Sequence, residues 1–183
     1  MTVPEMVKTR FTLVEVLEKA LAIGACLVFL GSIAFPFYKF MPSVMHFPGN
    51  GDHPIEYLWA YKLRTEYLLR THQPEEFWFD SYWSRQTTTR YDNLQLVLPS
   101  MLVAQIVTVA AAIASIVWRR RILTLIPVIG CSIVIALMMS ANMTLSTENA
   151  LVVDTVQIGY WLAYPALGLF ILRFLLTLKP RQP

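Results

Sequence analysis

The chain has 183 residues, of which 56% are hydrophobic and 15% charged, and its net charge is +3. Soluble domains carry about 25% charged residues, so this composition argues against an ordinary soluble domain and favours a chain that crosses a membrane. The small net charge argues against nucleic acid as a partner. Cys26 and Cys131 both lie inside apolar runs, which is typical of packing residues rather than of a disulfide.

Residues 1–19 are predicted to form an amphipathic segment on the cytoplasmic side. The string FTLVE at 11–15 resembles the start of a type IV prepilin. A pilin has one apolar helix before a globular head, and its cleavage site has glycine where this chain has Arg10. We therefore interpret the string as a helix start, in which Thr12 and Glu15 form a capping box.

The apolar run at 20–38 is predicted to be the first of four transmembrane helices. About 20 apolar residues, each rising 1.5 Å, cross a hydrocarbon core of about 30 Å. The segment 39–93 follows, and it is longer than an ordinary connection. It is expected to be extracytoplasmic and partly helical, with helices over 53–73 and 73–83.

Aromatic side chains are concentrated in this outer segment. One interpretation is an interfacial belt at headgroup depth. Another is a docking surface for a protein, because tryptophan and tyrosine dominate binding hot spots, and a surface that stacks on sugars is a third. The predicted partner-binding residues are Trp59, Trp78, Phe79, Tyr82 and Trp83.

The same segment holds the weak metal candidates Asp52, His53 and Glu56. These residue types bind metals, but no HExxH signature accompanies them. No histidine lies in an apolar run, which argues against a haem held within the membrane. The sequence therefore predicts no catalytic residue, no metal and no cofactor, and bound membrane lipid is the expected ligand.

Three more transmembrane helices are predicted after the outer segment. Prolines within them are tolerated in membrane helices. A short basic turn joins the second helix to the third, and an outer loop joins the third to the fourth. The helices are predicted over 94–118, 122–141 and 156–178. The turn covers 119–121, the outer loop covers 142–155, and a cytoplasmic tail covers 179–183.

The basic residues predict the orientation of these helices. Arg119, Arg120 and Arg121 fill the tight turn, and cytoplasmic loops carry an excess of lysine and arginine. Both termini are then cytoplasmic, and 39–93 lies outside. Arg173 is expected to extend to the cytoplasmic face, as long basic side chains near helix ends do.

Small residues spaced by four recur in the apolar runs, a pattern that lets helices approach closely. They serve either internal packing or contact with other subunits. The residues are Ala110 with Ala114, Ala111 with Ser115, Ser132 with Ala136 and Ser140, and Gly159 with Ala163.

The sequence thus predicts an all-α integral membrane protein of the cell membrane, with four transmembrane helices. The expected function is that of a non-catalytic accessory subunit of a larger membrane complex, docked to other membrane subunits through the outer aromatic segment and the small-residue faces. One alternative is a small redox or enzyme subunit acting on a lipid-soluble substrate such as a quinone. Another is a self-associating four-helix scaffold or adhesion protein.

Overall fold

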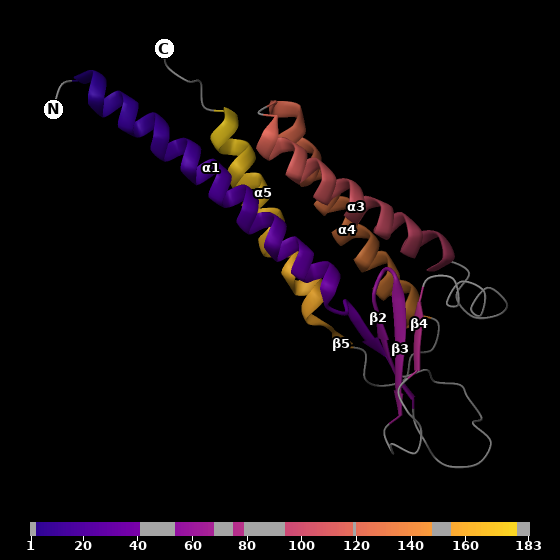
Figure 1. Ribbon diagram of the computed structural model, residues 1–183. Coiled ribbons are helices and arrows are strands. Elements are labelled where there is room, and N and C mark those ends of the chain that lie inside the picture. The colour runs from indigo at the N-terminus through magenta and orange to yellow at the C-terminus, as the bar shows by residue number, and fades with distance from the viewer. Residues whose placement is uncertain are drawn as a thin grey trace, which may run out of the picture.

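Four long helices lie side by side in the computed structural model, which describes residues 3–40, 54–67, 75–78, 94–118, 120–147 and 155–178 (Figure 1). Helix α1 packs against α5 and α3, and α4 packs against α3 and α5. The four helices therefore form a closed bundle. Their bounds are Val3–Ala34 for α1, Leu94–Val117 for α3, Arg121–Thr147 for α4 and Ile158–Leu178 for α5.

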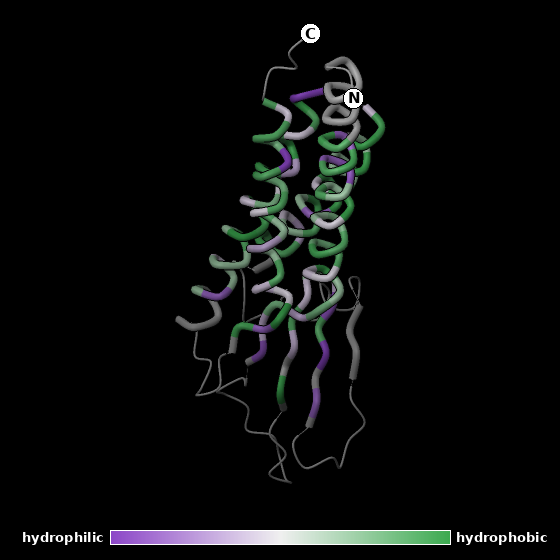
Figure 2. The backbone as a smooth tube through the Cα atoms, turned by 90° about the vertical axis from the view of Figure 1, so that its left-hand side faces the viewer, coloured by the Kyte–Doolittle hydropathy of each residue, from purple (hydrophilic) through white to green (hydrophobic). Residues whose placement is uncertain are grey.

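Among the described residues, three helices are long and apolar enough to cross a membrane: α3 over Leu96–Val117, α4 over Arg121–Met143 and all of α5. Figure 2 shows hydrophobic residues along most of their length. Large apolar side chains such as Ile106 and Leu172 are exposed on the outside of the bundle. Soluble monomers rarely expose large continuous apolar surfaces, so these faces are typical of helices in contact with lipid.

Helix α1 corrects the predicted organisation of the N-terminal region. The expected capping box at Thr12 and Glu15 is wrong, because both residues lie inside a helix that runs without a break from Val3 to Ala34. Pro4 suits the first turn of a helix, where no backbone N–H is required. The segments predicted as 1–19 and 20–38 thus share one helix, which ends two residues before Pro36.

A five-stranded antiparallel sheet corrects the all-α prediction. The described residues of 39–93 lie mostly in strands, so the helices expected over 53–73 and 73–83 are wrong at 54–67 and 75–78, where the structure describes them. The spatial order is β4-β3-β2-β1-β5. The strands are β1 Tyr38–Phe40, β2 Pro54–Leu58, β3 Lys62–Tyr67, β4 Glu75–Trp78 and β5 Thr155–Val156.

The alternation of buried and exposed side chains explains why this segment forms strands rather than helices. Leu58 and Leu63 face each other across β2 and β3 and are buried, whereas the neighbouring pair Tyr57 and Arg64 is partly exposed. A period of two suits a sheet with one buried face. Tyrosine, isoleucine and threonine also favour strands.

The bundle and the sheet share one hydrophobic core. Phe29 and Phe170 pack edge to face with their ring centroids 6.2 Å apart, and Tyr38, Leu58 and Leu63 belong to the same buried cluster. The sheet is therefore a direct continuation of the bundle rather than a separate domain.

Backbone hydrogen bonds fasten the sheet to the helix ends. The Phe37 N–H donates to the Leu58 carbonyl at 3.0 Å, and the Gln157 N–H donates to the Phe37 carbonyl at 3.1 Å. One end of each of α1 and α5 is thereby joined to the sheet. The start of α1, the end of α5 and the junction between α3 and α4 lie at the opposite end of the bundle (Figure 1).

Candidate functional site

The predicted partner-binding residues fall in different places. Trp59 is only 8% exposed, and its indole N–H donates to the Ala34 carbonyl at 3.0 Å. The Lys62 ammonium lies 4.4 Å from the centroid of the Trp59 ring. Trp59 is thus used inside the fold, where it satisfies a carbonyl at the end of α1. Trp78 ends β4, and the remaining three residues, Phe79, Tyr82 and Trp83, lie outside the described residues.

The structure brings together no metal site among the residues it describes. No group of three histidine, cysteine, aspartate or glutamate side chains is found there that could hold a metal ion. Of the predicted candidates, Glu56 lies in β2, whereas Asp52 and His53 lie outside the described residues.

The sequence does not predict the buried position of Arg173. Its side chain is 6% exposed and lies inside the bundle, so the expectation that it extends to the cytoplasmic face is wrong. Nη1 donates to Ser115 Oγ at 2.6 Å, and Nη2 donates to the Ser115 carbonyl at 2.8 Å. Ser115 Oγ in turn donates to the Ala112 carbonyl at 2.6 Å.

Arg173 joins two helices of the bundle. It belongs to α5, and Ser115, which accepts two of its hydrogen bonds, belongs to α3. Arg173 Nε is buried and has no hydrogen-bond partner among the described residues. A buried cation in a membrane helix marks a candidate functional position, and here it links α5 to α3.

Helices α3 and α4 are in close contact at Thr108 and Gly130. A Cβ atom at Gly130 would lie 2.1 Å from Thr108 Oγ1, so glycine suits this contact. Thr108 is fully buried, and its hydroxyl donates to the Ala104 carbonyl at 2.6 Å. One turn before it, Gln105 is also buried, and its Oε1 has no hydrogen-bond partner within the part of the chain that the structure describes.

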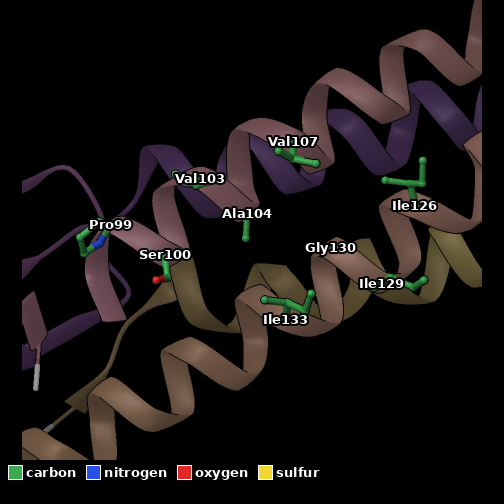
Figure 3. Close-up of a pocket in the computed structure, with 9 residues that line it drawn as sticks. All are labelled: Pro99, Ser100, Val103, Ala104, Val107, Ile126, Ile129, Gly130 and Ile133. Atoms are coloured by element: carbon green, nitrogen blue, oxygen red, sulfur yellow. The ribbon is translucent and has the colours of Figure 1, made fainter. Parts of the chain in front are cut away.

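A groove of about 500 Å³ runs between α3 and α4 beside this contact (Figure 3). Ala104 points into it from α3 and Ile133 from α4, and Ser100 supplies a hydroxyl. The lining consists of Pro99, Ser100, Val103, Ala104, Val107, Ile126, Ile129, Gly130 and Ile133. These residues carry no titratable side chain, so the groove is suited to an apolar ligand rather than to acid–base chemistry.

The structure separates two kinds of small residue. Gly159 and Ala163 are buried, and the Cys131 thiol donates to the Ala163 carbonyl at 3.5 Å, so this pair serves packing within the bundle. The stripe on α4 is different: Ser132, Ala136 and Ser140 are all exposed on the outside of the bundle.

Tyr160, Trp161 and Tyr164 form an aromatic cluster on the first turns of α5, beside the sheet. The hydroxyls of Tyr160 and Tyr164 are hydrogen-bonded to each other, and Trp161 is 61% exposed. The ring centroids of Tyr160 and Trp161 are 5.5 Å apart. Amphipathic rings at a helix end are typical of the boundary between membrane and water. The cluster on α5 is therefore a candidate membrane anchor that the sequence analysis did not single out.

The sequence matches no model of a known protein family and no curated protein. The function must therefore be inferred from the geometry of the chain itself.

Proposed function

We propose that this protein is a non-catalytic accessory subunit of a larger membrane complex. The exposed stripe of Ser132, Ala136 and Ser140 on α4 is the observation that carries this proposal. Membrane helices associate through small residues that let backbones approach closely. The bundle uses other small residues for its own packing, whereas this stripe lies on its outer surface, where we place a helix of another subunit.

The proposal includes four membrane-spanning helices, with α1 as the fourth. Helix α1 packs along α5, one of the three helices able to cross a membrane, and its residues Ala20 to Ala34 are mainly apolar. The sheet then lies on the extracytoplasmic side of the cell membrane. The two chain ends and the exposed Arg120 and Arg121 lie on the cytoplasmic side, in keeping with the excess of basic residues in cytoplasmic loops.

The orientation is tested by labelling single cysteines in intact cells, after Cys26 and Cys131 have been replaced by alanine. A membrane-impermeant thiol reagent should modify Ser84→Cys and should leave Arg120→Cys unmodified until the cells are opened. The reverse pattern would reject the proposed orientation.

The docking face is tested by Ala136→Phe, which places a large ring in the middle of the stripe. We expect the variant to fold but to lose the subunits that copurify with the wild-type protein in mild detergent. Gly168→Phe is the matched control, because Gly168 is exposed on α5 with no atom near its Cβ position. Identical sets of copurifying proteins for the wild type and Ala136→Phe would reject the α4 docking face.

The outer aromatic residues remain part of the proposal as a second contact. The double variant Trp78→Ala and Trp83→Ala should lose a partner if these rings form a hot spot, with each truncation costing about 2 kcal/mol or more of association. If they only anchor the protein in the membrane, the set of copurifying subunits stays unchanged.

A second candidate function, action on a lipid-soluble substrate, draws support from the α3–α4 groove. An apolar groove facing the membrane suits a quinone or a similar molecule. Its lining offers the Ser100 hydroxyl but no titratable or metal-binding side chain. We therefore favour a binding role for the groove over a catalytic one.

A further inference from the structure

We propose that the groove between α3 and α4 holds one acyl chain of a phospholipid from the leaflet on the side of the sheet. This inference goes beyond the role of an accessory subunit, and it stands even if the α4 docking face is rejected. It rests on the position of the groove, the small residues at its floor and the polarity of its ends.

The position of the groove puts it within reach of lipid. Its lining residues from α3 and α4 all belong to helices able to cross a membrane. From Ser100 to Val107 the groove follows α3 for about 10 Å along the helix axis, given a rise of 1.5 Å per residue. That is about a third of a hydrocarbon core of about 30 Å, so the groove holds part of a chain.

Small residues form the floor of the groove. Helices α3 and α4 approach closely enough at Thr108 that a Cβ atom at Gly130 would lie 2.1 Å from Thr108 Oγ1. Ala104 lines the groove from the other helix. A single unbranched chain is narrow enough to lie against Ala104 and Gly130.

The two ends of the groove differ in polarity, which sets the direction of the chain. Ser100 lies in the second turn of α3, toward the sheet, and is exposed. A hydroxyl there is suited to donate a hydrogen bond to the ester carbonyl of a phospholipid. At the other end lie Val107 and Ile126, which favour the apolar end of the chain.

Filling of the groove is favoured by dispersion rather than by the hydrophobic effect. The lipid tail is as apolar as the side chains, so its transfer from the bilayer gains little hydrophobic free energy. An empty groove of about 500 Å³ would instead leave the lining without contacts on one side. Water cannot replace a chain there, because buried water needs two to four polar partners.

The experiment uses the full-length protein in nanodiscs that contain phosphatidylcholine with a diazirine in its acyl chain. After irradiation, cross-linked peptides are identified by mass spectrometry. We expect labelling of Val103, Val107 and Ile129 to exceed that of the exposed α5 residues Leu172 and Leu175 by at least about fivefold. That ratio corresponds to roughly 1 kcal/mol of preference.

Ala104→Phe fills the groove from its floor and should reduce this labelling to the level of α5. Ala110→Phe, on the exposed side of α3 and outside the groove, should leave it unchanged. If Ala104→Phe fails to fold, Val107→Phe fills the groove from its partly exposed rim and replaces it. Equal labelling of the groove and α5, or labelling that survives the filling variant, would overturn the proposal, as would cross-linking of the groove to a copurified protein instead of lipid.

Discussion

Gly159 offers the sharpest test of how the sheet is joined to the bundle. A Cβ atom at this position would lie 2.5 Å from the Phe35 carbonyl oxygen and 2.7 Å from that of Pro36. Both are backbone atoms in a segment held by the bond from the Phe37 N–H to the Leu58 carbonyl. In Gly159→Ala, the first turn of α5 must therefore move away from the connection between α1 and β1.

The expected cost follows from these contacts. Overpacking costs about 1–3 kcal/mol, and the upper part of this range applies because backbone rather than a flexible side chain is in the way. The Gly159 N–H also donates to the Pro36 carbonyl at 3.0 Å, and weakening this bond adds up to about 1 kcal/mol. We expect the free energy of unfolding to fall by about 3 kcal/mol, which lowers the melting temperature by roughly 6–12 °C on the scaling for chains of this size.

The assay is thermal unfolding in detergent, followed by the fraction of protein that elutes as a monodisperse peak. Gly168→Ala is the control, since no described residue outside its own stretch of helix has an atom within 4 Å of its Cβ position. Alanine favours a helix over glycine by up to about 1 kcal/mol, so the control should melt at or above the wild-type temperature. If Gly159→Ala melts within about 2 °C of the wild type, a shift that corresponds to under 1 kcal/mol, the close contact is not part of the native structure.

Three further predictions concern buried polar groups and are measured by the same assay. Trp59→Phe removes the donor to the Ala34 carbonyl and should lower the free energy of unfolding by about 1 kcal/mol. Trp161→Phe, at an exposed position, should change it little. Equal effects of the two variants would contradict the role of the indole N–H. Ser115→Ala leaves a buried guanidinium nitrogen without its acceptor and should cost about 2–3 kcal/mol. Arg173→Leu removes the buried charge itself and should be neutral or stabilising; a large loss of stability in this variant would show that the arginine holds the bundle together.

The helical part of the fold could be predicted from the sequence because its signal is local. A run of about 20 apolar residues indicates a helix in lipid whatever the rest of the chain does. The run predicted over 94–118 coincides closely with α3, whereas α4 continues to Thr147, beyond the predicted end at 141. Helix ends depend on weaker signals, and residues 142–147 are polar enough to suggest a loop.

The sheet could not be predicted because its strands depend on distant partners. Residues 62–67 alternate charged, apolar and aromatic side chains in a way that fits either an amphipathic helix or a strand. Pairing with β2 and the burial of Leu63 against the core shared with the bundle favour the strand over the helix. Arg173 was misjudged for the same reason, because its partner Ser115 lies on another helix.

The order of the strands also bears on how the protein is made. Strand β1 pairs with β5, yet α3 and α4 come between them along the chain. During synthesis from the N-terminus, the edge of β1 that pairs with β5 stays unpaired until α3, α4 and then residues 155–156 have been made. Pairing of distant segments forms late and leaves intermediates open to misassembly. Completion of the sheet thus coincides with the arrival of α5, so a chain that fails to place its last helix also carries an unfinished sheet.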